Sequence, residues 1–272
     1  MLRIRSPLKG GVAGKLTTAL HQGWPNSELI ANDDLWEDIK EQEVPNAFFG
    51  LGDMNFYKVV ELHQNSKPYI FIDTPYWRRR GSQISDREAL WRICVGSIHV
   101  NKVVDNLDNR RTPGWSYKPW RTDDRSHVLV AESSPTINAF IGEPHWKDYA
   151  RKDLHPTRWP LLWREKPRHG RKSGPEFAQI PLQEHFEKAQ FVYTSCSIVG
   201  VEAILNGIPV VCHAISAAAP VASLDVKHIH KPDREDWFRT LQYHQFTMDE
   251  MANGTAYNIL KNLYVGKYPD LF

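Results

Sequence analysis

Hydroxyl side chains and one carboxylate gather in the stretch from Phe191 to Ser223, which is otherwise mainly apolar or small. Ser195 and Ser197 follow an apolar run, and Gly200 comes shortly after them. Hydroxyls and backbone N–H groups at the start of a helix suit anions such as phosphates, and a glycine there lets a ligand approach the backbone closely. We therefore expect a phosphate-binding turn in this stretch.

Glu202 is the only charged residue between Phe191 and His213. Burying a bare carboxylate costs several kcal/mol unless it is hydrogen-bonded. Glu202 therefore faces water, pairs with a cation, or accepts hydrogen bonds from sugar hydroxyls. From spacing alone, a solvated helix face and a ligand contact are equally open.

The elements that must position these residues form a βαβ pattern. An apolar strand beginning at Phe191 leads into a helix over Ile198–Leu205, which Asn206-Gly207 closes, and Ile208–Cys212 has the length of a second strand. Strand, helix and strand within about 20 residues are typical of a parallel sheet.

The string Ser195-x-Ser197-x-x-Gly200-x-Glu202-Ala203-x-x-x-Gly207-x-Pro209-Val210 resembles the donor-binding segment of GT-B glycosyltransferases. The nearest branch includes capsule-polysaccharide transferases. The resemblance implies that the glutamate holds the ribose of a nucleotide sugar, expected to be a UDP-sugar, and that the serines and the helix N-terminus hold the diphosphate. Such binding needs no metal or cofactor, which agrees with the absence of any Asp-x-Asp.

Three further segments are similar to bacteriophage-encoded, GT-B-like proteins of comparable length: Tyr69-Ile-Phe-Ile-Asp73-x-x-Tyr76, Trp163-Arg164-x-Lys166-Pro167 and Trp237-x-x-x-Leu241-x-Tyr243-x-Gln245. With the first string, the resemblance covers most of residues 69–262. It favours a hydroxymethylated pyrimidine in phage DNA as the acceptor. A cytoplasmic protein, of the infected host if phage-encoded, is expected because the sequence has no transmembrane stretch, no signal-peptide core and cysteines in apolar runs.

The predicted fold class is α/β and GT-B-like, with two Rossmann-like halves facing a cleft. Residues 1–121 are predicted to form the acceptor domain, and residues 122–246 the nucleotide-sugar domain. Residues 247–272, which open on a Thr247–Glu250 capping box, are predicted to form a helix that packs back on the first domain.

In the first half, Asp73 ends a buried strand that starts at Tyr69. Ligands of open parallel sheets bind at the carboxyl ends of strands, so Asp73 is the candidate general base. Its alternative role is a turn or helix cap. The candidate acceptor contacts that follow it are Tyr76, Trp77, Arg79 and Arg80, and the alternative for the run of arginines is solvated surface.

In the second half, Ser133 and Ser134 follow a predicted strand and join the candidate donor contacts, as does His213 after the last strand of the βαβ pattern. Arg164 and Lys166 end another strand. Cations there would neutralise the leaving diphosphate, a stabilisation worth ~3–4 kcal/mol per donor. The alternative for this pair is an ordinary surface Arg-x-Lys.

The composition, with 41% hydrophobic and 24% charged residues, is that of a folded soluble protein. No apolar stretch is long enough for a membrane span, and the N-terminus lacks a signal-peptide core. The three cysteines lie in apolar runs and are expected to be reduced. Gly10 to Lys15 invites a P-loop interpretation, but Lys9 and Leu16 stand where that motif needs glycine and a hydroxyl.

Net charge is +2, but two blocks are basic: residues 76–125 hold 11 Lys+Arg against 6 Asp+Glu, and residues 146–175 hold 9 against 3. Tryptophans lie among these charges, a combination that suits phosphate contacts and base stacking. The alternative is a solvated face over core tryptophans. Three other functions stay open: a carbohydrate glycosyltransferase, a non-catalytic DNA-binding module, and a phosphate-ester or nucleotide hydrolase.

Overall fold

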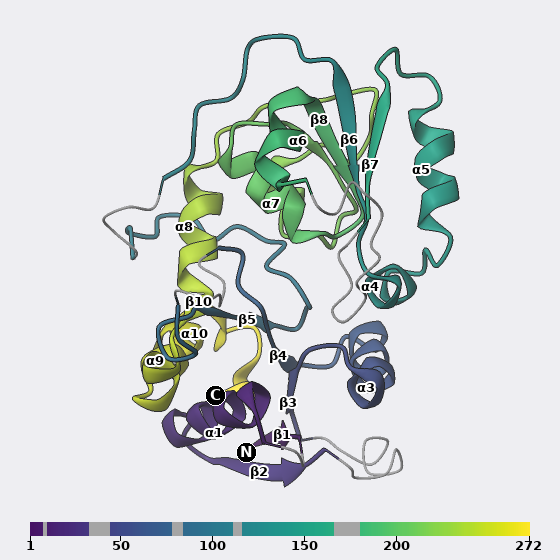
Figure 1. The fold of residues 1–272 in the computed structure, drawn as a ribbon. Helices are drawn as coiled ribbons and strands as arrows, with labels where there is room; N and C mark the ends of the chain where they lie inside the picture. The colour runs from purple at the N-terminus through teal and green to yellow at the C-terminus, as the bar shows by residue number, and fades with distance from the viewer. Residues whose placement is uncertain (8–9, 33–43, 78–83, 111–115, 166–179) are drawn as a thin grey trace. The chain divides into compact units, whose positions relative to one another are not determined.

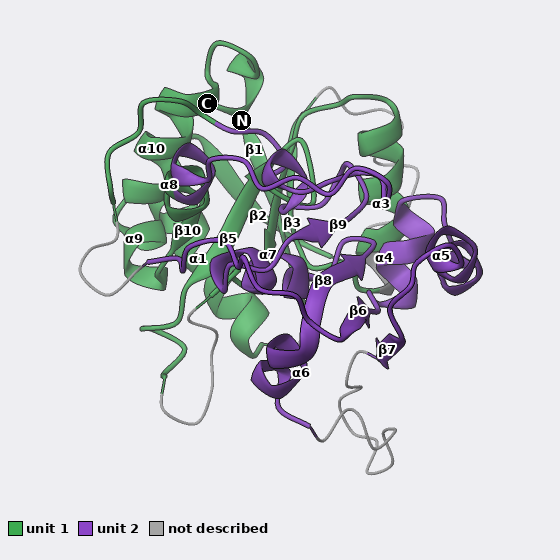
Figure 2. Cartoon of the chain, turned by 90° about the horizontal axis from the view of Figure 1, so that it is seen from above, with its two compact units in different colours: residues 1–100, 104–110, 239–272 green, residues 101–103, 111–238 purple. Residues whose placement is uncertain are grey.

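The structure is a computed structural model that describes residues 1–7, 10–32, 44–77, 84–110, 116–165 and 180–272 (Figure 1). The chain divides into two compact units (Figure 2). Unit 1 comprises residues 1–100, 104–110 and 239–272, and unit 2 comprises residues 101–103 and 111–238. The domain boundaries predicted from the sequence, after residues 121 and 246, fall inside unit 2 and inside the last segment of unit 1.

Unit 1 contains a six-stranded sheet with strand order β10-β5-β4-β3-β1-β2. The pairs among β1 to β4 are parallel, whereas β5 and β10 run antiparallel to their neighbours. The strands are β1 (Leu2–Ser6), β2 (Ser27–Ala31), β3 (Asn46–Phe49), β4 (Tyr69–Asp73), β5 (Trp91–Val95) and β10 (Gln245–Phe246).

Among the described residues, four α-helices belong wholly to unit 1: α1 (Val12–Gly23), α3 (Asp53–Gln64), α9 (Met248–Ala252) and α10 (Thr255–Tyr264). Leu16 and Leu20 of α1 are buried in a core that also holds Ile4 and Ile70 from the sheet. The C-terminal end of α1 meets α9 so closely that a Cβ on Gly23 would lie 1.9 Å from the Met251 carbonyl oxygen. This contact requires glycine, and it fixes α9 against α1.

Unit 2 contains a four-stranded, all-parallel sheet with order β7-β6-β8-β9. Its strands are β6 (His127–Ala131), β7 (Leu161–Arg164), β8 (Ala189–Thr194) and β9 (Val210–Val211). Its helices are α4 (Pro135–Phe140), α5 (Trp146–Leu154), α6 (Leu182–Lys188), α7 (Ile198–Leu205) and the short 3-10 helix η2 (Ala219–Val221). The α/β prediction, with two sheets rich in parallel strands, is confirmed.

Local predictions hold where the pattern is strong. Strand β8, helix α7 and strand β9 form the expected βαβ unit, although β9 spans two residues of the five predicted. Thr247 makes the predicted capping box with Glu250, at the start of α9.

Residues 98–100 are buried but form no strand, because the positive φ of Gly96 ends β5 just before them. Helix α8 (Glu235–Tyr243) ends before Gln245, since Gln245 and Phe246 pair with β5 instead. The boundary between the units falls within α8, and the described chain ends in the 3-10 helix η3 (Pro269–Leu271).

Arg234 holds the C-terminal end of α7 within unit 2. Its guanidinium donates to the Ile204 carbonyl oxygen at 2.6 Å and to the Lys118 carbonyl oxygen at 2.7 Å. The same group lies 3.9 Å from the ring centroid of Trp120. These contacts fasten the segment around Lys118 to the far end of the helix that carries Gly200 and Glu202.

Candidate functional site

The carboxyl edge of the unit 2 sheet has a topological switch point between β6 and β8. From β6 the chain passes to β7 on one side, and the next strand, β8, lies on the other side of β6. The turns that leave β6 and β8 therefore diverge, and ligands of open α/β sheets bind where such turns diverge. Ser133 and Ser134 follow β6, and Ser195 and Ser197 follow β8.

Two of these serines cap the helices that start at this edge. The Ser134 hydroxyl accepts a hydrogen bond from the Ile137 N–H at 3.3 Å, and the Ser197 hydroxyl accepts one from the Val199 N–H at 3.3 Å. Both serines are half-buried. The N-termini of α4 and α7, with their partial positive charge, thus start at the switch point.

The other two serines form a buried hydrogen-bond network with Asn138 of α4. The Ser195 hydroxyl oxygen lies 2.7 Å from that of Ser133 and 2.8 Å from Asn138 Oδ1. The Cys196 N–H donates to the Ser133 hydroxyl at 3.0 Å. Exposed fractions are 3% for Ser133, 4% for Asn138 and 1% for Ser195. In this structure the hydroxyls of Ser133 and Ser195 link the two turns by hydrogen bonds and are not exposed to a ligand.

Gly200 is buried in the first turn of α7 and serves packing. A Cβ at this position would lie 3.3 Å from Thr194 Cγ2, 3.4 Å from Ala218 Cβ and 3.5 Å from Val210 Cγ1. The absence of a side chain therefore lets α7 lie close to β8 and β9. The predicted use of this glycine, close approach of a ligand, has no support in this geometry.

Arg164 and Glu202 interact electrostatically at the same edge. Partial burial lowers the pKa of the Arg164 guanidinium, and the negative charge of Glu202 acts in the opposite direction. Arg164 also donates to the Ile180 carbonyl oxygen at 2.7 Å. Both side chains are half-buried, so of the three environments expected for Glu202, the neighbourhood of a cation is the one observed. Lys166 lies outside the described residues.

His213 follows β9 and is tied to the turn after β8. Its N–H donates to the Ser195 carbonyl oxygen at 3.0 Å, and its Nδ1 accepts from the Ile215 N–H at 3.3 Å. The ring is half-buried. The structure therefore brings Ser134, Ser197, Glu202 and His213 to the carboxyl edge of one sheet, together with Arg164.

A small pocket of about 140 Å³, which sequence reasoning missed, adjoins Arg164. Lys147 of α5 lies between two carboxylates, 3.1 Å from Glu165 Oε1 and 3.4 Å from Glu132 Oε1. Burial opposes the charge of Lys147, but these two partners outweigh it and raise the lysine pKa. Trp163 completes one wall. The residues are distant in sequence, so no local motif marks the pocket.

The candidate residues of unit 1 have mainly structural contacts. Asp73 Oδ2 accepts from Arg92 Nη2 at 2.8 Å, and Asp73 Oδ1 accepts from the Thr74 N–H at 2.7 Å. This is the capping arrangement expected as the alternative to a general base. Tyr76 is fully buried and its hydroxyl accepts from the Val100 N–H at 2.9 Å, so it offers no surface to an acceptor.

Trp77 is half-buried, and its backbone N–H lies near Gln245 Oε1, at 3.4 Å. Arg79 and Arg80 lie outside the described residues.

Several tryptophans of the two basic blocks are used inside the protein. Trp91 and Trp146 are buried in the two cores. Trp120 is half-buried, donates through Nε1 to the Pro232 carbonyl oxygen at 2.8 Å, and packs under Arg234. Trp91 and Trp146 are therefore not available for stacking on bases, and one face of Trp120 is already taken by Arg234.

Among the described residues, no group of three or more His, Cys, Asp or Glu side chains is placed to hold a metal ion. None of the helices in the described part of the chain is long and apolar enough to cross a membrane.

No protein-family model matches the chain, and no curated protein matches it. The solved structures that are similar to it include two of KpsC from Thermosulfurimonas dismutans. The beta Kdo 2,7 transferase has a TM-score of 0.48 at 11% identity, with 94% of this chain and 99% of that chain covered. The beta Kdo 2,4 transferase has a TM-score of 0.44 at 12% identity, with 90% and 92% covered.

Proposed function

We propose that this protein is a glycosyltransferase that takes a sugar from a nucleotide sugar, and that the diphosphate of the donor binds at the switch point of unit 2. One observation carries the proposal. Two serine-capped helix N-termini and the guanidinium-bearing Arg164 occupy the carboxyl edge of an all-parallel sheet. Peptide dipoles and a cation together suit a diphosphate, whose negative charge grows as it leaves.

The proposed donor contacts divide between the phosphates and the ribose. Ser197 and the first turn of α7 hold phosphate oxygens, and Arg164 supplies a forked donor that matches two of them. Glu202, one turn into α7, accepts hydrogen bonds from the ribose hydroxyls. It also interacts electrostatically with Arg164, and both side chains are half-buried at the edge of the sheet.

Three buried residues support this site without meeting the donor: Ser133, Ser195 and Gly200. Their contacts fix the two turns and the position of α7, so the groups that meet the donor have defined places. Pre-organised donors stabilise developing charge more effectively than mobile ones, since they need not reorient during the reaction.

For the acceptor we favour the hydroxyl of a carbohydrate over a base in DNA. A flipped base would need exposed aromatic rings for stacking. Trp91 and Trp146 are core residues, and Trp120 is already covered by Arg234.

The test is a calorimetric titration of the full chain with a panel of nucleoside diphosphates, followed by transfer assays with radiolabelled nucleotide sugars. Glu202→Ala should weaken binding of the preferred diphosphate at least tenfold, whereas Glu184→Ala, an exposed glutamate of α6, should leave it unchanged. Binding of no nucleoside diphosphate by the wild type, or equal binding by Glu202→Ala, would sink the assignment. Transfer to DNA, and to no carbohydrate, would reverse the choice of acceptor.

A further inference from the structure

The side-chain amide of Asn138 uses only one of its two polar atoms within the protein. Its exposed fraction is 4%, and its Oδ1 accepts a hydrogen bond from the Ser195 hydroxyl at 2.8 Å. That bond fixes the orientation of the amide, so the two N–H bonds of Nδ2 are directed elsewhere. No described residue accepts a hydrogen bond from Nδ2, and this atom is not sealed from solvent. Because polar groups in a protein interior are nearly always paired, an unused donor at the switch point of unit 2 calls for an acceptor from outside the chain.

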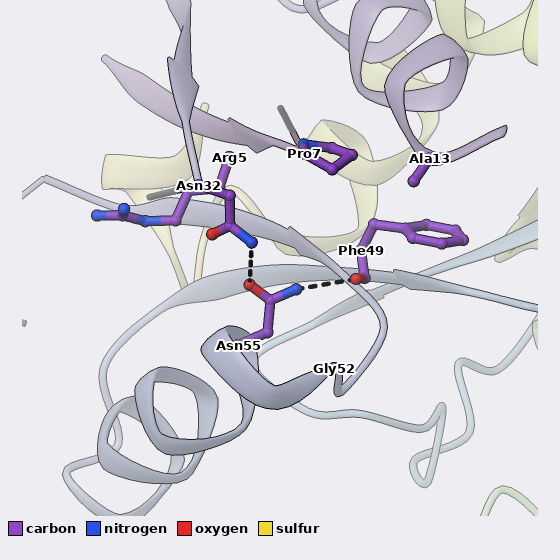
Figure 3. Close-up of a pocket in the computed structure, with 7 residues that line it drawn as sticks. All are labelled: Arg5, Pro7, Ala13, Asn32, Phe49, Gly52 and Asn55. Atoms are coloured by element: carbon purple, nitrogen blue, oxygen red, sulfur yellow. Dashed lines mark hydrogen bonds between the residues drawn. The ribbon is translucent and has the colours of Figure 1, made fainter. Parts of the chain in front are cut away.

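Asn55 of unit 1 is an equally buried amide whose hydrogen bonds all lie within the protein (Figure 3). Its Nδ2 donates to the Phe49 carbonyl oxygen at 2.9 Å and to the Gly50 carbonyl oxygen at 3.1 Å. Its Oδ1 accepts from Asn32 Nδ2 at 3.0 Å, and Figure 3 shows these two amides facing each other. The exposed fraction of Asn55 is 6%, close to that of Asn138, yet both of its polar atoms have partners. Burial alone therefore does not explain the unused donor of Asn138.

A carboxylate without a partner of its own lies near this amide. The Glu143 N–H donates to the Asn138 carbonyl oxygen at 2.8 Å, which holds Glu143 at the end of α4. The pKa of the Cys196 thiol is raised by burial, by Cys212 and by the negative charge of Glu143. Cys196 belongs to the network around Asn138, because its N–H donates to the Ser133 hydroxyl at 3.0 Å. The Glu143 carboxylate is half-buried and forms no hydrogen bond or ion pair with a described residue.

These two groups lie on the opposite side of the sheet from α7. Trp146 of α5 stacks on Tyr193, with ring centroids 5.8 Å apart, whereas Gly200 of α7 packs against the next residue, Thr194. Successive residues of a strand face opposite sides of its sheet, so α5 and α7 cover opposite faces (Figure 1). Glu143 comes just before α5, and its charge repels phosphate. The α7 side of the carboxyl edge therefore suits the diphosphate, and the Glu143 side suits an uncharged part of the donor.

We propose that Asn138 and Glu143 hold hydroxyl groups of the sugar that the donor carries. A sugar hydroxyl can both donate and accept, so one hydroxyl gives its proton to the Glu143 carboxylate while it or its neighbour accepts from Asn138 Nδ2. A sugar whose hydroxyls do not match this donor and acceptor leaves one of them unpaired, which makes the two residues determinants of sugar specificity. The inference rests on the proposed glycosyltransferase function, and it assigns to the sugar two residues that the diphosphate does not touch.

Two substitutions of nearly unchanged shape test the two contacts separately. Glu143→Gln removes the charged acceptor. Asn138→Asp keeps the acceptor for the Ser195 hydroxyl and removes the N–H donor. The matched controls are Glu184→Gln on α6 and Asn258→Asp on α10, both at exposed positions. Thermal melts show whether each variant is folded, and the half-buried position of Glu143 keeps the test available if Asn138→Asp does not fold.

The experiment is calorimetry of the full chain with UDP, GDP and ADP, and with UDP-glucose, GDP-mannose and ADP-glucose. For the nucleotide that binds, Glu143→Gln should weaken binding of the nucleotide sugar about tenfold, because a hydrogen bond to a charged group is lost. Binding of the nucleoside diphosphate should stay unchanged. Asn138→Asp should show the same selectivity, and both controls should bind the two ligands as the wild type does.

Analogues of the bound sugar add a measurement that a merely structural role would not affect. Among its monodeoxy analogues, the one without the contacted hydroxyl should bind the wild type and Glu143→Gln equally. Equal losses for the nucleoside diphosphate and the nucleotide sugar, or no loss in a folded Glu143→Gln, would overturn this inference and leave the diphosphate site standing. Binding of neither kind of ligand by the wild type would overturn the proposed function, and this inference with it.

Discussion

The Ser195 hydroxyl lies 2.7 Å from the Ser133 hydroxyl, although 62 residues separate them in the chain. Asn138 completes the link from the first turn of α4. Two turns that bring the capped ends of α4 and α7 to the carboxyl edge of unit 2 are thereby joined through buried side chains. The positions of the capping residues Ser134 and Ser197 follow from contacts that no ligand needs to touch.

Removing the Asn138 amide should destabilise unit 2. In Asn138→Ala the Ser195 hydroxyl loses a buried partner, a change that costs about 1–3 kcal/mol. Chemical denaturation of the single variants Asn138→Ala and Ser195→Ala, and of the double variant, measures the coupling between them. Because the two groups share one hydrogen bond, the double variant should lose less than the sum of the single losses. Strict additivity would show that the link contributes nothing.

Arg164 should contribute a charge-assisted contact to the donor. Hydrogen bonds to charged groups are worth about 1.5–3 kcal/mol, so Arg164→Gln should weaken binding of the preferred nucleoside diphosphate by about tenfold or more. Arg164→Lys keeps the charge but not the fork, and an intermediate affinity is expected. Calorimetry gives both values, with thermal melts as the check on folding. If the glutamine variant binds as well as the wild type, Arg164 lies outside the donor site.

The Asp73–Arg92 pair should act on stability. Arg92 is buried, whereas the Asp73 side chain is 28% exposed, so solvent screens part of the interaction. We expect Asp73→Asn to destabilise unit 1 by about 1–2 kcal/mol, since one charge partner and one cap acceptor weaken together. Denaturant midpoints measure this loss. A variant of unchanged stability that has lost turnover would instead restore Asp73 as the general base.

Acid should weaken unit 1 through His244. Burial lowers the pKa of this histidine to about 4, the Thr240 carbonyl acts against that shift, and the Arg110 charge adds to it. The ring nitrogens have fixed roles: Nδ1 donates to the Thr240 carbonyl oxygen at 2.8 Å, so Nε2 accepts from the Tyr264 hydroxyl at 2.6 Å.

The sign of the pH dependence follows from this depressed pKa. Between pH 6.5 and about 4 the unfolded chain binds a proton that the folded chain does not. The contribution of His244 is therefore complete above pH 6.5 and is lost as pH falls towards 4, by an amount on the order of 3 kcal/mol. Stability curves of the wild type and His244→Gln should converge across this window. Parallel curves would contradict the assignment.

The features that could be predicted from the sequence are those that depend on residues close together in the chain. The βαβ unit around α7 and the capping position of Ser197 follow from a local pattern of apolar, hydroxyl and glycine residues. The role of Ser195 could not be predicted, because its partner Asn138 lies 57 residues away. The structural role of Asp73 could not be predicted either, because its partner Arg92 lies on the antiparallel neighbouring strand β5.

Other structural features have no repeating sequence pattern that could predict them. Strand β10 has only two residues and forms because it pairs with the edge of β5. Asn32 and Asn55 are polar residues in different segments, and their amides meet only in the fold. Tyr76 is the last residue of a sequence motif, yet its burial depends on the core residues around it rather than on that motif.

Unit 1 takes its last strand and its last two α-helices from residues beyond 238, whereas unit 2 draws nearly all of its chain from one uninterrupted segment. During synthesis on the ribosome, the sheet of unit 2 can therefore form while the earlier sheet still lacks β10. Until that strand emerges, β5 has an uncovered edge open to association with other chains. The order of translation thus makes the first-made part of this protein the last to be completed.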